Sequence, residues 1–388
     1  MKVAVVVEWA DPWRGGAETS TQQFVRHLSD LGIAVDLITR SRLSPAPGIG
    51  VQTIRVRSPL RGRGSARFAT LAARRVRGAY DIVHAITPCL AADVYEPRGG
   101  TVAETIERNV ALRDGAARTI KRLTSRFNAR QRRMLKLERR LLLARQPPVV
   151  IAISDYVARQ LERHYGFPRS RIGLIFNGVE PDTAAPAQRD EHRLSVRRLY
   201  GIADDESLAL LVAHNFRLKG ISAWIDALPS LAADNGCALR SLVVGKDNPQ
   251  RWQRRAYRRG VADRIRFVGP TRRIEAFYHA ADFLVHPTYY DPCSRVVLEA
   301  MASGLPVVTT EFDGAAEAVR DGISGFVLAD PRDGRLAACV RQLCRPEVRA
   351  QMSVAASEQA PGFTMRRHAE RVTELYRSLR MSAAAAAS

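Results

Sequence analysis

Two acidic residues eight apart, Asp291 and Glu299, lie in the segment 288–310, TYYDPCSRVVLEAMASGLPVVTT. Asp291 precedes a Pro-Cys-Ser turn, and Glu299 lies about two turns inside the amphipathic helix that this pattern predicts. A helix N-terminus can hold an anion because its first backbone N–H groups are unpaired and the helix dipole is positive there. The helix face that carries Glu299 could hydrogen-bond hydroxyl groups. The spacing therefore suits a nucleotide-sugar, although an ordinary capped helix with a solvated glutamate fits it equally well.

Two loops elsewhere in the chain could bind phosphates. Gly15 and Gly16 separate a buried apolar run from a helical pattern, and glycine lets a backbone approach a phosphate closely. A simple turn is the more frequent outcome for two adjacent glycines. The loop 215–220 (NFRLKG) connects a second buried strand to a helix. Its cations, Arg217 and Lys219, could neutralise charge that develops on a leaving diphosphate.

Short β-branched runs alternate with helical patterns along most of the chain. Because these runs are continuously apolar, they are typical of parallel strands buried on both faces, and they lie at 3–7, 35–39, 81–85, 149–153, 208–214, 239–245 and 264–269. A chain of 388 residues is long enough for two domains, each with its own core. We therefore predict two Rossmann-like α/β domains with the functional residues at the carboxyl ends of the strands.

The segment 288–310 resembles the E-x7-E element of retaining glycosyltransferases with the GT-B architecture, in the large family that includes the lipopolysaccharide core glucosyltransferases. Residues 171–182 (RIGLIFNGVEPD) match the Asn-Gly-Val hinge that closes the first domain in that family. Lys219-Gly220 matches its diphosphate-binding pair, whose usual arginine partner lies at a different offset from Arg217. The resemblance covers nearly the whole chain and is thinnest at 40–150.

Two departures from the family pattern concern the sugar. Asp291 is one methylene shorter than the usual glutamate, and Pro292-Cys293-Ser294 replaces the usual glycine-containing turn. The resemblance still implies that Asp291 contacts the transferred sugar, that Glu299 contacts the ribose, and that the glycine pair faces the sugar-phosphate. The expected catalytic residues are Asp291, Lys219 and Arg217. The expected donor-binding residues are Gly15, Gly16, Arg217, Lys219, Asp291, Cys293, Ser294, Arg295, Val296 and Glu299.

The resemblance also implies a domain organisation: α/β, GT-B, two Rossmann-like domains facing a deep interdomain cleft. The acceptor domain spans 1–177 with a returning helix at 363–380, and the nucleotide-sugar domain spans 178–362. The low-complexity tail 381–388 is expected to be disordered. Loop 87–101 faces the acceptor in related enzymes, so the acceptor-side candidates are His84, Asp93 and Arg98. A lone histidine at a strand end, such as His84, is more often structural.

The net charge of +21 favours an anionic partner, and 27 Lys/Arg against 12 Asp/Glu place +15 of it in residues 1–150. Residues 118–145 contain 11 Lys/Arg and one acid, with apolar residues at helical spacing beside the cationic face. A surface helix with its stripe on the core is the ordinary interpretation. The charge excess favours anionic lipid headgroups, and residues 122–126 resemble the membrane-interacting segment of lipopolysaccharide core glucosyltransferases. The expected membrane contacts are Arg122, Arg126, Phe127, Arg130, Arg132 and Arg133.

The cellular compartment follows from three observations. The five cysteines lack paired spacing, which predicts reduced thiols and no zinc site. The start, MKVAVVVEWADPW, is typical of a first core strand rather than a signal peptide. No stretch approaches the roughly 18 apolar residues that span a bilayer. We therefore expect a cytoplasmic enzyme that associates peripherally with the inner (cytoplasmic) membrane.

The favoured function is transfer of a hexose from a UDP-sugar to a lipid-linked or phosphorylated glycan such as a lipopolysaccharide core. Glucose is the favoured hexose. No Asp-x-Asp element stands out, so we expect no metal and no other cofactor; the UDP-sugar is a co-substrate. Two alternatives stay open. A nucleotide-sugar 2-epimerase has the same fold but needs acid and base groups across the sugar and no acceptor groove. A nucleic-acid-binding protein would explain the charge, but no aromatic residues are interleaved with the arginines, so no specific nucleic acid is expected.

Overall fold

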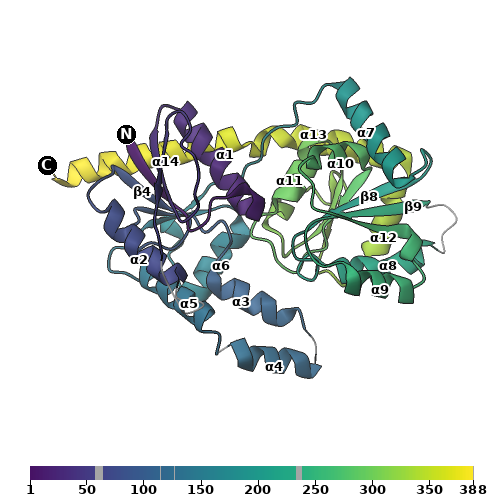
Figure 1. Ribbon diagram of the computed structural model, residues 1–388, viewed down its shortest axis with the longest axis horizontal. Helices are drawn as coiled ribbons and strands as arrows, with labels where there is room; N and C mark the ends of the chain where they lie inside the picture. The colour runs from purple at the N-terminus through teal and green to yellow at the C-terminus, as the bar shows by residue number, and fades with distance from the viewer. Residues whose placement is uncertain (57–63, 114, 126, 233–237, 388) are drawn as a thin grey trace. The chain divides into compact units, whose positions relative to one another are not determined.

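The computed structural model describes residues 1–56, 64–113, 115–125, 127–232 and 238–387. The chain divides into two compact units, one formed by Met1–Glu180 with Phe363–Ser388 and the other by Pro181–Gly362. The sequence placed this division three residues earlier, at 177. Each unit is a parallel sheet with helices on both faces (Figure 1).

The sheet of the first unit has the strand order β3-β2-β1-β4-β5-β6-β7, and every pair is parallel. Its strands are β1 (Lys2–Val6), β2 (Ala34–Thr39), β3 (Ile49–Thr53), β4 (Ile82–Ala85), β5 (Val94–Tyr95), β6 (Val149–Ala152) and β7 (Ile172–Leu174). Its helices are α1 (Gly16–Asp30), α2 (Gly64–Val76), α3 (Val102–Ala111), α4 (Gly115–Ser125), α5 (Ala129–Leu142), α6 (Asp155–Tyr165) and α14 (Met365–Ala387), with short 3-10 turns η1 (Pro12–Arg14) and η2 (Arg169–Arg171).

The second unit repeats the pattern with the order β10-β9-β8-β11-β12-β13. Its strands are β8 (Ser207–Val212), β9 (Leu239–Val244), β10 (Ile265–Gly269), β11 (Phe283–Val285), β12 (Val307–Thr310) and β13 (Gly325–Leu328). Its helices are α7 (Pro186–Tyr200), α8 (Ile221–Ala232), α9 (Gln250–Arg258), α10 (Ile274–Ala280), α11 (Arg295–Ala302), α12 (Leu336–Cys344) and α13 (Pro346–Gln359), with 3-10 turns η3 (Ala262–Arg264) and η4 (Gly314–Ala318), and η5 (Ala360–Phe363) leads into α14.

In both sheets the strand order reverses once, between β1 and β4 in the first unit and between β8 and β11 in the second. The loops that follow these two strands diverge to opposite faces, which leaves a crevice beyond their carboxyl ends where ligands of open α/β sheets bind. The segments where a ligand site is expected are therefore those after β1 and β4 in the first unit and those after β8 and β11 in the second unit.

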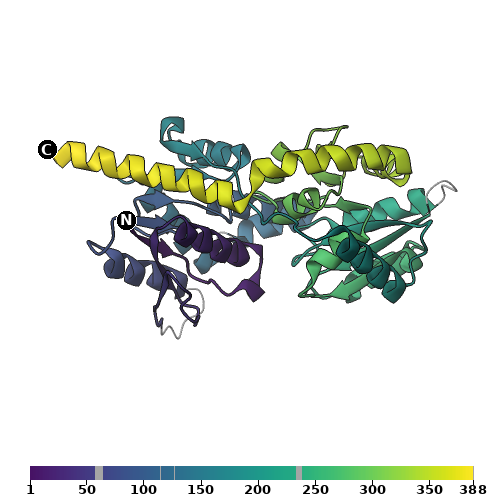
Figure 2. The same cartoon turned by 90° about the horizontal axis from the view of Figure 1, so that it is seen from above.

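The last helix, α14, returns the chain to the first unit. It packs against α1, and both Figures 1 and 2 show the two helices running side by side. Its buried residues Met365, Val372 and Tyr376 join the same core cluster as Val3 and Phe24. The first unit is therefore completed by residues from the end of the chain.

Three expectations require correction. Residues 118–145 do not form one helix: α4 ends at Ser125 and α5 begins at Ala129, because the side-chain oxygen of Asn128 accepts the N–H of Gln131 and starts a new helix. The tail 381–388, predicted to be disordered, continues α14 to Ala387, since alanine has the highest helix propensity. Cys344 is disulfide-bonded, so the five cysteines are not all reduced.

Candidate functional site

Lys219 and Asp291 lie in the two loops that leave the point where the second sheet reverses its strand order. Lys219 follows β8 and Asp291 follows the neighbouring strand β11. The loops are joined directly, because the N–H of Tyr289 donates to the carbonyl of Leu218 at 2.9 Å. Gly220 has a φ of +70°, and a Cβ there would lie 1.8 Å from the carbonyl oxygen of Pro287, so only glycine permits this approach.

The side chains of Lys219 and Asp291 form an ion pair, with 17% and 19% of their side-chain surfaces exposed. Lys219 Nζ also donates to the carbonyl of Tyr290 at 3.3 Å, so these contacts use two of its three N–H groups. Burial alone would raise the pKa of Asp291, but Lys219 and the nearby imidazole of His286, 3.7 Å away, hold that pKa below its ordinary value. Asp291 is therefore a carboxylate at neutral pH, beside a cation.

Glu299 is held in place by two donors. It lies in α11, where Arg295 one turn earlier donates to Oε1 at 2.9 Å and the hydroxyl of Tyr278 donates to Oε2 at 2.9 Å. Tyr278 is buried, and burial together with the charge of Glu299 raises its pKa well above the ordinary value, so the phenol stays a donor. Since a carboxylate oxygen accepts more than one hydrogen bond, Glu299 retains capacity for ligand hydroxyls.

Asp313 is a third acid at this end of the sheet, and the sequence interpretation missed it. It follows β12, the strand beside β11, and it is 1% exposed. Its Oδ1 accepts the N–H groups of Ser294 and Ala315, each at 2.9 Å, and its Oδ2 bonds to the hydroxyl of Thr309 at 2.9 Å. Burial, and then the charge of Asp291, raises the pKa of Asp313 to about 7. The sequence feature that could have identified Asp313 is its position just after a buried strand.

The other donor-side candidates have different surroundings. Arg217 shares the loop of Lys219, and its charge, after burial, lowers the pKa of Arg251 in α9. Cys293 is buried just before α11, whereas Val296 is half-buried on the same helix as Glu299. In the first unit, Gly15 immediately precedes α1, which begins at Gly16, so the glycine pair lies at the carboxyl end of β1 as predicted.

Two of the acceptor-side candidates, His84 and Arg98, are buried in an ion network of the first unit. Glu96 accepts from Arg98 Nε at 2.8 Å and lies 2.9 Å from His84 Nε2 and 3.4 Å from His368 Nε2. His84 Nδ1 lies 2.6 Å from the hydroxyl of Tyr376. Burial alone would raise the pKa of Glu96, but Arg98 and the histidines hold it well below its ordinary value. The network fastens α14 to the sheet, so we now assign His84 and Arg98 a structural role.

Asp93 lies at the amino end of its strand, β5, in the interior of the sheet. It precedes β5, and its carboxylate accepts the N–H of Val83 near the start of β4 at 2.7 Å. Ligands of such sheets bind at the carboxyl ends of the strands. The amino-end position therefore argues against an acceptor contact by Asp93.

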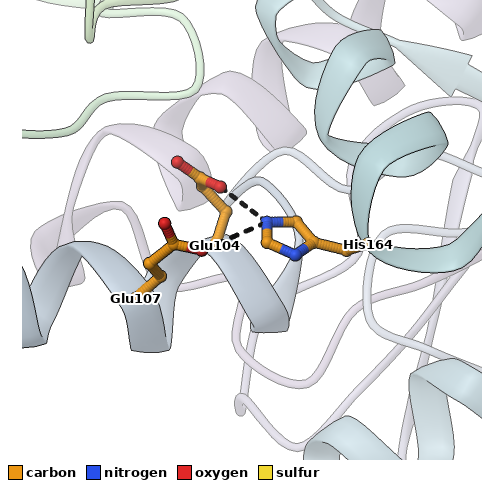
Figure 3. Close-up of side chains that lie close together, drawn as sticks. All are labelled: Glu104, Glu107 and His164. Carbon is orange, nitrogen blue, oxygen red and sulfur yellow. Dashed lines mark hydrogen bonds and ion pairs between the residues drawn. The ribbon is translucent and has the colours of Figure 1, made fainter. Parts of the chain in front are cut away.

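Among the described residues, Glu104 and Glu107 of α3 and His164 of α6 form a group that could ligate a metal ion (Figure 3). His164 Nε2 lies 2.6 Å from Glu104 and 3.9 Å from Glu107. Arg108 binds Glu104 at 2.5 Å, and Arg163 contacts both glutamates. A divalent ion would face these two guanidinium groups, so we interpret the group as an ion-pair cluster that joins α3 to α6.

The predicted membrane contacts lie on and after a helix without a buried face. No residue of α4 is buried, and Ile120 and Leu123 are 60% and 53% exposed. Phe127, which follows α4, is 81% exposed. By contrast, α5 buries Leu141 and Leu142. Of the predicted cations, Arg122, Arg130 and Arg132 are exposed, Arg133 is half-buried, and Arg126 lies outside the described residues. No helix in the described parts of the chain is long and apolar enough to cross a bilayer.

Comparisons with known proteins agree with this architecture. A family model described as "Glycosyltransferase Family 4" matches residues 14–183, and one described as "Glycosyl transferases group 1" matches residues 208–345. The lipopolysaccharide glucosyltransferase WaaG of Escherichia coli (strain K12) is 30% identical over 210 residues, which cover 54% of this chain and 55% of WaaG. The D-inositol 3-phosphate glycosyltransferase of Geodermatophilus obscurus is 29% identical over 412 residues, covering 96% of this chain and 86% of that enzyme.

Two solved structures show the same fold. The crystal structure of WaaG, described as a glycosyltransferase involved in lipopolysaccharide biosynthesis, has a TM-score of 0.81 at 23% identity and covers 96% of this chain and 99% of that chain. Anabaena Alr3699/HepE in complex with UDP-glucose has a TM-score of 0.69 at 19% identity and covers 97% of this chain and 100% of that chain. The alignment with the WaaG sequence spans only about half of either protein, so the activity of WaaG does not pass to this chain by likeness alone.

Proposed function

We propose a donor, an acceptor and a stereochemical course for this chain, which belongs to the glycosyltransferases of the GT-B architecture. The chain transfers glucose from UDP-glucose to a lipid-linked glycan such as a lipopolysaccharide core, with retention of the anomeric configuration and without a bound metal. The observation that carries the proposal is the pairing of Lys219 with Asp291 where the second sheet reverses its strand order.

Each group in this site has a defined part in the proposed reaction. As the glycosidic bond to the diphosphate lengthens, positive charge develops on the sugar, and the ionised carboxylate of Asp291 stabilises it. The remaining N–H of Lys219, with the first turn of α11, stabilises the negative charge on the leaving diphosphate. That diphosphate takes the proton of the acceptor hydroxyl on the same face of the sugar. Because Lys219 supplies the positive charge, the reaction proceeds without a divalent ion.

Support for the donor and the acceptor comes from named relatives. A solved structural neighbour binds UDP-glucose, and one sequence relative is a lipopolysaccharide glucosyltransferase. A second acceptor class is supported by the length of the alignment, because a D-inositol 3-phosphate glycosyltransferase aligns with 96% of this chain, whereas WaaG aligns with 54%. Inositol phosphate is therefore the acceptor to test against the lipid-linked glycan.

A thermal-shift screen followed by a transfer assay tests the proposal. UDP-glucose, UDP-galactose and GDP-mannose are compared, and a ligand at 100 times its Kd stabilises the protein by about 2.7 kcal/mol. We expect UDP-glucose to give the largest shift and its turnover to require an acceptor. Conversion of the sugar without any acceptor would instead support the epimerase alternative. If no nucleotide-sugar shifts the unfolding temperature, the donor assignment is wrong.

We also propose that α4, Phe127 and the exposed cations of α5 dock the enzyme on the cytoplasmic face of an anionic membrane. A soluble donor and a lipid-linked acceptor must meet in one site, and α4 leaves its apolar stripe outside the core. Each cation near such a surface contributes about 1 kcal/mol. Because screening acts over about 8 Å at physiological salt, this part of the binding weakens as salt is added.

Sedimentation with phosphatidylglycerol-containing vesicles separates the two contributions. Replacing Arg130, Arg132 and Arg133 by glutamine should weaken binding about 100-fold at physiological salt. Ile120→Ser with Leu123→Ser should abolish the fraction that remains bound at high salt. The matched control is Leu194→Ser with Leu199→Ser in α7, whose side chains are 60% and 71% exposed. Equal binding by the control and both test variants would remove the membrane proposal.

A further inference from the structure

The loop after β1 holds a tryptophan at the surface of the first unit. Trp13 is 61% exposed, whereas Trp224 and Trp252 in the second unit are buried. Its loop connects β1 to α1 and leaves the sheet beside β4, where the strand order reverses. Ligands of open α/β sheets bind beyond the strands at such a reversal. A large apolar side chain is therefore exposed where the first unit is expected to bind a ligand.

Hydrogen bonds fix the backbone of this loop. The N–H of Ala10 donates to the hydroxyl of Ser41 at 2.9 Å, and the carbonyl of Ala10 accepts the side-chain amide of Gln22 at 2.7 Å. The N–H of Trp13 donates to the side chain of Asp11 at 3.1 Å, at the start of η1. The exposure of Trp13 is therefore built into the fold. Such a preorganised surface favours binding because little further ordering of the backbone is needed.

Glu8 supplies a carboxylate at the start of the same loop. Its N–H donates to the hydroxyl of Thr87, which follows β4, at 2.9 Å, and 10% of its side-chain surface is exposed. Arg40, which follows β2, donates to Oε1 of Glu8 at 2.8 Å, and its guanidinium lies 4.6 Å from the centre of the Trp9 ring. Since a carboxylate accepts about four hydrogen bonds, Glu8 retains capacity for the hydroxyls of a ligand.

An indole and a carboxylate in one loop suit a sugar ring better than a phosphate. The apolar C–H face of a sugar packs on an aromatic ring, and the sugar hydroxyls donate to a carboxylate. Arg40 is a cation that could attract a phosphate, but Glu8 neutralises it. A phosphate placed beside Glu8 would also be repelled by the like charge of the carboxylate.

We propose that Trp13 and Glu8 bind an unphosphorylated sugar ring of the acceptor, which packs on Trp13 and donates a hydroxyl to Glu8. This assignment rests on the proposed function, since it assumes a glycosyl acceptor. It favours a glycan over inositol 3-phosphate, because Glu8 selects against a phosphate at this position. Trp13 and Glu8 thereby replace His84 and Arg98, which belong to a structural network, as the acceptor contacts of the first unit.

Steady-state kinetics with UDP-glucose and a dephosphorylated core oligosaccharide from lipopolysaccharide test the contact with Trp13. Trp13→Ala should raise the KM for the oligosaccharide about tenfold, through the loss of one aromatic contact, and leave the KM for UDP-glucose within about twofold. Trp13→Phe should restore most of the affinity. The matched control is Tyr257→Ala in α9, which removes an aromatic side chain that is 80% exposed in the second unit and should change neither KM.

Glu8→Gln should act in opposite directions on two acceptors. Glutamine keeps the shape of the side chain but removes its charge, which leaves Arg40 without a counter-charge. We therefore expect kcat/KM for inositol 3-phosphate to rise about tenfold, while the KM for the oligosaccharide rises a few-fold. Thermal unfolding of this variant shows whether it is folded, and the Trp13 variants keep the assignment testable if it is not.

Acrylamide quenching of tryptophan fluorescence measures acceptor binding without turnover. The chain has four tryptophans, and since Trp224 and Trp252 are buried, the accessible emission comes from Trp9 and Trp13. The oligosaccharide should protect the wild-type protein from quenching and give much less protection to Trp13→Ala. Protection by phosphatidylglycerol vesicles and not by the oligosaccharide would instead assign Trp13 to a membrane contact and overturn the sugar contact.

The results that contradict this assignment differ from those that contradict the proposed function. A wild-type KM for the oligosaccharide in Trp13→Ala removes the sugar contact but leaves the transferase assignment intact. An equal loss in Trp13→Ala and Tyr257→Ala shows a general disturbance and also overturns the contact. A lower kcat/KM for inositol 3-phosphate in Glu8→Gln overturns the selection against phosphate. If UDP-glucose neither binds nor reacts, the donor assignment fails, and the quenching of wild-type protein with and without the oligosaccharide still decides whether Trp13 binds a sugar.

Discussion

Replacing Lys219 by alanine removes the cation that pairs with Asp291 and leaves that carboxylate inside the site. We expect turnover with UDP-glucose to fall by about two to three orders of magnitude, the usual effect of losing one group that stabilises transition-state charge. The loss should appear in kcat more than in the affinity for UDP-glucose, because negative charge on the diphosphate increases as the bond breaks.

The same substitution has a predictable effect on stability. Breaking a fully buried ion pair from one side costs about 3–5 kcal/mol. Since Lys219 and Asp291 keep 17% and 19% of their side-chain surfaces exposed, we expect about 2 kcal/mol, or roughly 4–8 °C in Tm for a unit of this size. The pKa of Asp291 is depressed in the folded protein, so its stabilising contribution is present above the unfolded pKa and is lost as pH falls. The difference between variant and wild type should therefore shrink below about pH 4.

A double-mutant cycle with Asp291→Asn separates these effects from a general disturbance. Asp291→Asn removes the charge that Lys219 neutralises, so adding Lys219→Ala to it should cost less stability than adding it to wild type. Scanning calorimetry gives the Tm values, and coupled UDP release gives turnover. A Lys219→Ala protein that folds normally and turns over at the wild-type rate would place Lys219 away from the diphosphate. A coupling energy near zero would show that the ion pair contributes nothing to the folded state.

Three further predictions follow from the same contacts. Glu299→Gln should weaken UDP binding about tenfold in calorimetry, whereas Asp291→Asn should reduce transfer more than UDP affinity; unchanged UDP affinity in Glu299→Gln would remove the ribose assignment. Tyr278→Phe removes one of the two donors that hold Glu299, so we expect a smaller loss of UDP affinity, a few-fold, with no effect if Glu299 does not touch the nucleotide. Glu96→Gln leaves Arg98 buried without its carboxylate and should cost about 3–5 kcal/mol in denaturant unfolding at neutral pH, and a change below 1 kcal/mol would show that the network is not stabilising.

The fold was largely predictable because its strands are short, continuous apolar runs that differ from helical patterns. Every such run identified in the sequence corresponds to a strand of one of the two sheets. The order of the strands was not predicted, since apolar character does not specify which strand lies beside which. The end of α14 was misjudged because a run of alanines is low in complexity and yet strongly helix-forming.

The candidate site was predictable only in part, because its contacts join residues that are far apart in the chain. Lys219 and Asp291 are brought together by the adjacency of β8 and β11, which no spacing within either loop specifies. Asp313 was missed for a related reason. Its role depends on accepting the N–H of Ser294, a contact across 19 residues that becomes possible only when β12 lies beside β11.

The segment 118–145 shows what helical periodicity predicts and what it leaves open. Apolar residues repeat at the same spacing through both α4 and α5, so the pattern predicts an amphipathic helix in each place but does not say what covers the apolar face. In the structure α5 buries Leu141 and Leu142 and pairs Glu138 with the hydroxyl of Tyr95, which anchors it to the sheet. In the described part of the chain, no residue of α4 is buried, so its apolar stripe lacks such a cover there. An apolar stripe exposed beside cations is the pattern that an anionic bilayer can cover, because the bilayer offers apolar and anionic contacts at once, and this is the reason for proposing that α4 docks on a membrane.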